Sequence, residues 1–206
     1  MCVPVVQQRR LDALNSAGAF ILCRSNRAEI QRASLRNPPR TSDRIRSASS
    51  LTVSSMTESQ RILDAAQQRA RQGGLPYFGA VTPTEAHALI SAVPNAQLID
   101  VRTRAEWDYV GRVPGSFLIE WNSYPDGRRN PRFLDELRQH CADPTAPVLF
   151  LCRSGHRSDG AARAATAAGY AMAFNVLEGF EGDRDSEGHR GTVGGWRKAR
   201  LPWVQG

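Results

Sequence analysis

The stretch that decides the fold is residues 148–158, which read Val148-Leu149-Phe150-Leu151-Cys152-Arg153-Ser154-Gly155-His156-Arg157-Ser158. Its first four residues form an uninterrupted apolar run, as expected of a central parallel strand that is covered on both faces. The residues that follow, 158–168, are rich in alanine and end before Gly169, a natural residue for the end of a helix. Cys152 is therefore expected in a turn that leads from a buried strand into a helix.

Segments of strand and helix character alternate on both sides of this turn. Strands are expected at 98–101, 116–119, 148–151 and 174–177, and helices at 60–72, 83–93, 104–109, 133–141 and 158–168. The second of these helices has a well-marked start, because Thr82 can cap it, Pro83 suits its first position and Glu85 can close a capping box. The alternation predicts an α/β fold with an open, mostly parallel central sheet flanked by helices on both faces.

The composition is that of an ordinary globular protein, with 41% hydrophobic and 23% charged residues in a chain of 206. No apolar run approaches the roughly 20 residues that a membrane helix needs, so no membrane partner is expected. The net charge of +7 is uneven, because residues 1–55 hold nine arginines and three acidic residues. Residues 56–206 are thus nearly neutral and contain no basic patch interleaved with aromatic residues, so no nucleic-acid partner is expected.

The N-terminal part, residues 1–55, is rich in Arg and Ser, poor in acidic residues, and unlike the rest of the chain. It is expected to be a disordered arm, a transit peptide or a non-native extension upstream of a true start at Met56, and the last of these is favoured. A helix and linker are then expected over 56–79, followed by the main domain over 80–206. The expected location is cytoplasmic, or an organelle if residues 1–55 are a transit peptide.

The cysteines favour neither a disulfide framework nor a structural metal. Cys2, Cys23, Cys141 and Cys152 are widely spaced, with no C-x-x-C pair and no cluster with His at zinc-ligand spacing. Two of them lie in the N-terminal part, which leaves two for the domain. A reducing compartment fits this pattern better than an oxidising one, and no metal or other cofactor is expected.

The turn after Cys152 has the features of an anion site. In an open parallel sheet, ligands bind beyond the carboxyl ends of the strands. Backbone N–H groups of a curled loop and the N-terminus of the next helix can converge there, and both stabilise negative charge. We therefore expect Cys152 to be present largely as a thiolate, supported by Arg153, His156 and Arg157. A buried structural thiol is the alternative, but such polar neighbours would fill a core poorly.

These residues resemble those of a known family: Cys152 to Ser158 is similar to the active-site loop of the rhodaneses. Residues 98–107, continuing to 111–116, resemble that family's upstream signature, and residues 176–180, with Trp196 and 201–203 downstream, resemble its C-terminal one. The three motifs occur in family order over residues 80–204. Two departures are an Arg at 112, where the family usually has His, and residues 181–195, which are interposed in the C-terminal motif. Residues 181–188 are expected to form a solvated loop at the pocket edge. His189, Arg190 and Trp196 could reach the site from there.

The resemblance implies a sulfurtransferase that works through a Cys152 persulfide, without a cofactor. A small anionic donor such as thiosulfate loads the sulfur, and a thiol or cyanide acceptor takes it. The residues expected to bind the substrate are Arg153, Ser154, Gly155, His156, Arg157 and Ser158. Asp100, Arg102 and Glu106 are expected to support the loop rather than to react.

Two other functions stay open at this point. The chain could be a relay module that receives the persulfide from a partner protein and passes it on. A Cys-dependent phosphatase on the same fold is disfavoured, because the spacing from Cys152 to Arg157 is C-x4-R, and the phosphatase loop is C-x5-R. The shorter loop suits a sulfur atom better than a phosphate.

Overall fold

The structure, a computed structural model, describes residues 56–205. Its strands are β1 (Gly79–Val81), β2 (Gln97–Asp100), β3 (Phe117–Leu118), β4 (Val148–Leu151) and β5 (Ala173–Val176). Its helices are α1 (Glu58–Gly73), α2 (Pro83–Ala92), α3 (Arg104–Tyr109), α4 (Phe133–His140) and α5 (His156–Ala167). The strands form one parallel sheet in the order β1-β5-β4-β2-β3, so the expected open α/β sheet is confirmed.

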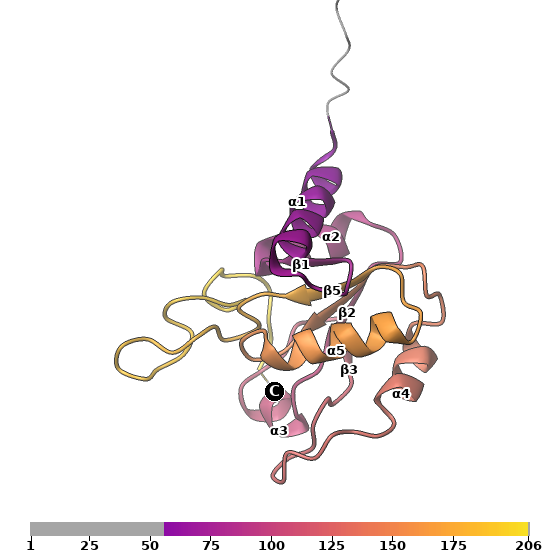
Figure 1. The fold of residues 1–206 in the computed structure, drawn as a ribbon. Coiled ribbons are helices and arrows are strands. Elements are labelled where there is room, and N and C mark those ends of the chain that lie inside the picture. The colour runs from indigo at the N-terminus through magenta and orange to yellow at the C-terminus, as the bar shows by residue number, and fades with distance from the viewer. Residues whose placement is uncertain (1–55, 206) are drawn as a thin grey trace, which may run out of the picture. The chain divides into compact units, whose positions relative to one another are not determined.

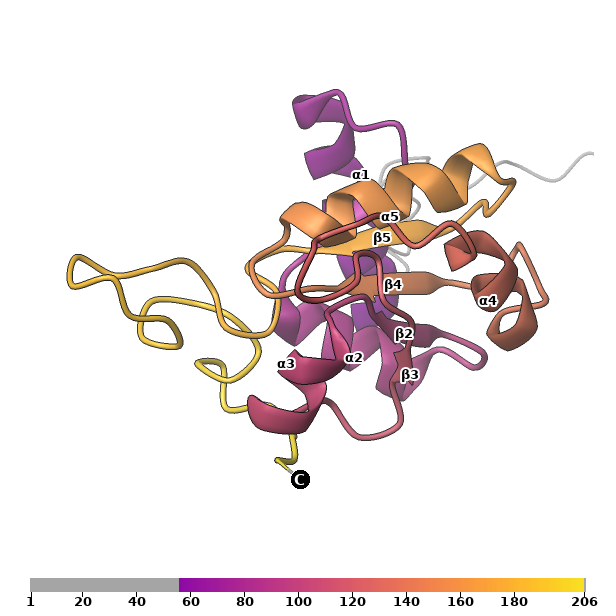
Figure 2. The same cartoon turned by 90° about the horizontal axis from the view of Figure 1, so that it is seen from below.

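Helices cover both faces of the sheet, as the two ribbon views show (Figures 1 and 2). Side chains of α4 and α5 pack on one face, and side chains of α1 and α2 pack on the other. Alternate residues of β4 serve the two faces, because successive side chains of a strand point in opposite directions. Val148 and Phe150 contact the first layer, and Leu149 and Leu151 the second. All four are buried, which explains the uninterrupted apolar run.

Local signals in the sequence placed most helix ends to within one residue. The capping box of Thr82 and Glu85 starts α2, with Pro83 in the first turn. Gly169 follows α5 with a φ of +99°, a conformation that suits glycine at the end of a helix. The expected strand at 116–119 is shorter in the structure, where only Phe117 and Leu118 pair with β2.

One helix start and one further strand also differ from the expectation. α5 begins at His156 and not at Ser158, so His156 and Arg157 lie in its first turn and not in the preceding loop. β1 was not expected, and Gly79, assigned from the sequence to a linker, is its first residue. β1 pairs with β5 and lies under α1, where a Cβ on Gly79 would come within 2.7 Å of the Ala66 side chain. Close packing by α1 thus requires the glycine.

Residues 1–55 and 206 lie outside the described part of the chain, so the interpretations of the N-terminal extension stay predictions. In the part that is described, no helix is long and apolar enough to cross a membrane. The described residues also contain no cluster of three or more His, Cys, Asp or Glu side chains placed to hold a metal ion.

Candidate active site

Cys152 directly follows β4 and continues its alternation. Its side chain lies on the same face as those of Val148 and Phe150, the face that α5 covers. The residue is only 1% exposed. The chain then turns through Gly155, whose φ of +94° is in the left-handed region that favours glycine. This turn brings the first residues of α5 back over the cysteine.

The sulfur of Cys152 accepts hydrogen bonds from two groups of this turn. The backbone N–H of Gly155 lies 3.1 Å from Sγ, and the Oγ of Ser158 lies 3.2 Å from it. Ser158 is fully buried, so its hydroxyl has little choice of partner. One amide and one hydroxyl therefore reach the sulfur, where the sequence led us to expect several amides.

The N-terminus of α5 adds a second favourable influence. The helix has 12 residues, and no side chain of the described residues caps its first turn. Its leading N–H groups therefore keep the partial positive charge of a helix start, next to Cys152. A thiolate or persulfide anion at Cys152 would be stabilised at this position.

Arg157 is placed differently from the expectation. Its guanidinium forms a two-pronged ion pair with Glu106 of α3, with both N–O distances at 2.7 Å. Burial alone would lower the pKa of Arg157, but the hydrogen bonds and charge of Glu106, with smaller contributions from Cys152 and Asp100, raise it overall. Arg157 therefore adds positive potential near Cys152, but its hydrogen-bonding edge is already occupied.

Glu106 holds two elements with one carboxylate. It caps α3 by accepting hydrogen bonds from the N–H and hydroxyl of Thr103, and it binds Arg157 of α5. Burial alone would raise the pKa of Glu106, but the bonds from Arg157 and Thr103 lower it to about 2. The carboxylate is thus ionised at neutral pH and ties the two helices together.

Arg153 is the other arginine of the loop, and it is exposed. No hydrogen bond or ion pair joins its guanidinium to any residue within 56–205. Of the two loop arginines, it is therefore the one whose charge is available to a ligand. Ser154 is half-buried and His156 is exposed, and neither side chain forms a hydrogen bond to the sulfur within the described residues.

Asp100 and Arg102 form a fully buried ion pair at the end of β2. Arg102 also donates to the carbonyl oxygen of Gly111 at 2.7 Å and lies over the ring of Phe180, 4.0 Å from its centre. These contacts connect the segment after β2 with the segment after β5. Neither charged side chain reaches solvent, so the ion pair is placed to support the backbone around it and not to contact a ligand.

A segment after β5 fixes the backbone of the loop. The N–H of Phe180 donates to the carbonyl oxygen of Cys152 at 2.7 Å, and that of Glu181 to the carbonyl oxygen of Arg153 at 2.9 Å. Gly179 lies so close that a Cβ there would come within 2.3 Å of the Cys152 oxygen. This contact with the loop was not expected from the sequence, although Gly179 is a residue type that permits such a close approach.

Known proteins match this arrangement. Residues 82–185, about half of the chain, match the family described as the rhodanese-like domain. The chain belongs to the rhodanese-like family.

Individual relatives and one solved structure are also similar to this chain. A crystal structure of Rv0390 from M. tuberculosis is 48% identical, with a TM-score of 0.57, over 62% of this chain and 97% of that one. An uncharacterized protein of Rickettsia rickettsii is 34% identical over 60% of this chain and 94% of its own length. The thiosulfate sulfurtransferase GlpE of Tolumonas auensis is 27% identical over 56% of this chain and 97% of its own.

The rhodanese-like loop is bordered by a pocket of about 520 Å³. The pocket is lined by Arg153 and Arg157, by α3 and its flanks, and by the loop before α4; the residues are Thr103, Ala105, Glu106, Val110, Asn122, Ser123, Tyr124, Pro125, Gly127, Arg153 and Arg157. Cys152 directly precedes Arg153 in the chain but does not itself line the pocket. Residues 122–125 and 127 were not expected at the site, because only the tertiary fold brings them to it.

Residues 181–195 contribute no lining residue to this pocket. The segment is organised around Asp185, which accepts hydrogen bonds from the N–H of His189 and the hydroxyl of Thr192. Trp196 is fully buried in the core, and its indole N–H donates to the carbonyl oxygen of Pro202. The expectation that His189, Arg190 or Trp196 reaches the pocket is therefore wrong.

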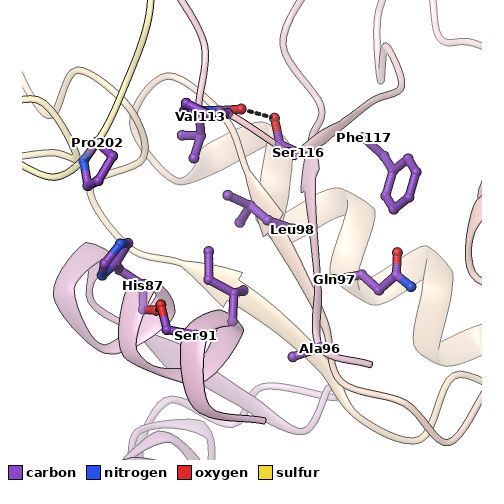
Figure 3. Close-up of a pocket in the computed structure, with 12 residues that line it drawn as sticks. His87, Ser91, Ala96, Gln97, Leu98, Val113, Ser116, Phe117 and Pro202 are labelled. Carbon is purple, nitrogen blue, oxygen red and sulfur yellow. Dashed lines mark hydrogen bonds between the residues drawn. The ribbon is translucent and has the colours of Figure 1, made fainter. Parts of the chain in front are cut away.

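A second pocket, of about 480 Å³, lies at the N-terminal end of β2 (Figure 3). His87 and Ser91 of α2 face it from one side, and Ser116 and Phe117 border it on another. It includes none of the candidate site residues. The pocket beside Arg153 is therefore the one of the two that borders the candidate site residues.

Proposed function

We propose that this rhodanese-like protein is a sulfurtransferase that carries sulfane sulfur on Cys152. The observation that carries the proposal is the seat of Sγ, which accepts hydrogen bonds from Gly155 and Ser158 at the N-terminus of α5. These groups favour an anionic sulfur, first as a thiolate and then as a persulfide. The relative named as a thiosulfate sulfurtransferase supports the same reaction class.

The reaction has two steps. The Cys152 thiolate attacks the outer sulfur of the donor, the sulfur–sulfur bond of the donor breaks, and its electron pair leaves with the rest of the donor, which is sulfite when the donor is thiosulfate. Cys152 is then a persulfide anion. A nucleophilic acceptor, such as a thiolate or cyanide, attacks the outer sulfur and releases the Cys152 thiolate. No net oxidation of the protein occurs.

The residues of the loop have different roles in the proposed reaction. Gly155 and Ser158 hold the sulfur, Arg153 attracts the anionic donor, and Arg157 supplies background positive potential while it is held by Glu106. Asp100 and Arg102 brace the end of the neighbouring strand. The occupied guanidinium of Arg157 also weighs against a phosphatase, which would need that group for the phosphate oxygens.

Mass spectrometry of the intact protein tests the proposal. After incubation with thiosulfate, we expect a gain of one sulfur atom in the wild type and in Cys141→Ser, and none in Cys152→Ser. Cys141 is the matched control, because it is also a buried free thiol, and burial raises its pKa to about 11. Thiocyanate formation from added cyanide should follow the same pattern.

Two outcomes would redirect the proposal. Loading of Cys152 by a cysteine desulfurase, but by no free donor, would favour the relay function over a thiosulfate enzyme. Release of phosphate from an aryl phosphate, without thiocyanate formation, would favour the phosphatase. Sulfur on Cys141 instead of Cys152 would contradict the proposed site.

A further inference from the structure

A further pocket, of about 680 Å³, lies between α3, β3 and the segment that leads into α4. It includes none of the candidate site residues, and Ser123 is the one described residue that it shares with the pocket beside Arg153. Its volume is in the range that is usual for sites of small organic ligands. The lining of this pocket therefore has no role in the proposed sulfur transfer.

A buried hydrogen-bond donor of this pocket has no acceptor. Trp107 of α3 lines the pocket and is only 7% exposed. Its indole N–H is buried and donates to no oxygen within residues 56–205. A buried indole N–H normally finds an acceptor, because leaving it without one costs about 1–3 kcal/mol. An oxygen atom of a ligand in the pocket would supply the missing acceptor.

Four arginines line the pocket, and one of them differs from the others. Arg104, Arg128 and Arg132 each form an ion pair with an acidic side chain. Arg129 lies over the ring of Trp121 and forms no ion pair in the part of the chain that the structure describes. Partial burial lowers the pKa of Arg129, and no acidic group of the described residues acts to raise it. The charge of Arg129 is therefore available to an anionic group.

Glu120 carries the opposite charge in the same pocket. Its Oε1 accepts a hydrogen bond from the N–H of Arg104 at 2.6 Å, at the start of α3. Within residues 56–205 its carboxylate has no ionic partner, and Arg129 does not pair with it. A cation and an anion thus line one pocket without neutralising each other. A ligand that carries both charges would pair with both of them.

We propose that this pocket binds a free α-amino acid with an apolar side chain. Its carboxylate accepts hydrogen bonds from Arg129 and from the indole N–H of Trp107, and its ammonium group donates to Glu120. Trp107, Leu118 and Pro131 form the apolar part of the wall, and Leu118 is 38% exposed. The side chain of the amino acid would cover this surface and remove it from water. The proposal does not depend on sulfur transfer at Cys152.

Calorimetry with L-leucine and its derivatives tests the proposal on the wild-type protein. We expect saturable binding of L-leucine with a dissociation constant below about 1 mM. L-leucinamide lacks the carboxylate and N-acetyl-L-leucine lacks the ammonium group, so each should bind at least about tenfold more weakly. Glycine keeps both charges but has no side chain, and should bind about fivefold more weakly or less well still.

Variants of the lining residues assign each contact. Arg129→Gln and Glu120→Gln should each weaken L-leucine at least about tenfold, and glutamine at 120 keeps an oxygen for the N–H of Arg104. Trp107→Phe keeps a ring but removes the donor, and should weaken L-leucine about fivefold. Arg128→Gln is the matched control, because Arg128 lines the same pocket but is paired with an acidic side chain, and it should keep the wild-type affinity. Unchanged thermal midpoints would show that the variants fold.

The outcomes separate this site from the sulfur site. No saturable binding of L-leucine up to about 10 mM, or equal affinities for L-leucine and L-leucinamide, would overturn the proposal. Cys152→Ser should bind L-leucine as the wild type does, because the pocket does not include the sulfur. Loss of binding in Cys152→Ser, or competition between L-leucine and thiosulfate for one site, would place the ligand at the other pocket and refute the amino-acid site. A Cys152 that accepts no sulfur would leave these binding results unchanged.

Discussion

Glu106 shows how much a single carboxylate can determine in this site. It closes the first turn of α3 and neutralises Arg157 of α5. The side chains of Glu106 and Arg157 are both more than three-quarters shielded from solvent. The position of Arg157 in the first turn of a helix is electrostatically unfavourable, since that turn already has positive character. Glu106 offsets this, and so allows α5 to begin close to Cys152.

Removal of this carboxylate charge should therefore weaken the fold. In Glu106→Gln, Arg157 loses its ionic partner in a largely buried place, and we expect a loss of about 2 kcal/mol in the free energy of unfolding. Urea denaturation measures it. Asp108→Asn is the control, because the Arg104–Asp108 pair is exposed, and it should change stability by less than about 0.5 kcal/mol. Equal losses in the two variants would contradict this role of Glu106.

The same carboxylate predicts a dependence of stability on pH. The pKa of Glu106 is about 2 in the folded protein, against an ordinary value of 4.5. Above pH 4.5 it is ionised in both states and its contribution is complete. As the pH falls from 4.5 toward 2, the unfolded chain takes up the proton first, so the folded state loses about 2 to 3 kcal/mol. Urea midpoints of wild type and Glu106→Gln should converge over this range; a constant difference would refute the assignment.

At the scale of elements, the segment after β5 is what keeps the loop in shape. Residues 179–182 lie along the backbone of Cys152 and Arg153, and their N–H groups hold both carbonyl oxygens. The loop thus has one wall from its own helix and one from a segment far along the chain. Disturbing the second wall should disturb the sulfur position.

Gly179→Ala tests this directly. The new Cβ would overlap the Cys152 carbonyl oxygen at 2.3 Å, and the φ of +60° already favours glycine. We expect a loss of about 3 kcal/mol or more in the free energy of unfolding and slower sulfur loading. Gly188→Ala shares the positive φ but meets no atom within 4 Å, and should cost only about 1 kcal/mol. Similar effects of the two changes would contradict the close packing.

The same elements show what the sequence could and could not predict. The strand at 148–151 and the start of α2 were predictable, because an apolar run and a capping box are local signals. The start of α5 was placed two residues late, since His156 and Arg157 are unfavourable in a first turn without the distant Glu106. β1 was missed because its three residues form a strand only through pairing with β5 and packing under α1.

The candidate site shows the same difference between features with a local sequence signal and features that depend on the tertiary fold. Its contiguous part, from Cys152 to Ser158, could be read from the sequence, although the roles of these residues stay predictions until the sulfur transfer is measured. The availability of Arg153 and the pocket wall at Tyr124 could not be read, because both depend on which side chains the fold brings together. Pairing of charges across α3 and α5 is a tertiary property.

At the scale of the whole molecule, α1 belongs to the core of the domain. Ile62, Ala66 and Ala70 are buried against the sheet. A chain that starts at Leu75 should therefore lose at least about 3 kcal/mol in the free energy of unfolding relative to a chain that starts at Met56, because the apolar surface under α1 becomes exposed. Thermal and urea unfolding of the two chains measure this, and equal midpoints would contradict it.

The depth of Cys152 has a consequence for timing. With the residue only 1% exposed, a sulfur atom that the proposed reaction places on it would be screened from reductants and oxidants in the medium. In the proposed transfer, an acceptor would have to reach this enclosed position before it could remove the sulfur. The persulfide form of the protein would thus persist until an acceptor arrives, so that loading of the sulfur and its delivery need not occur at the same time.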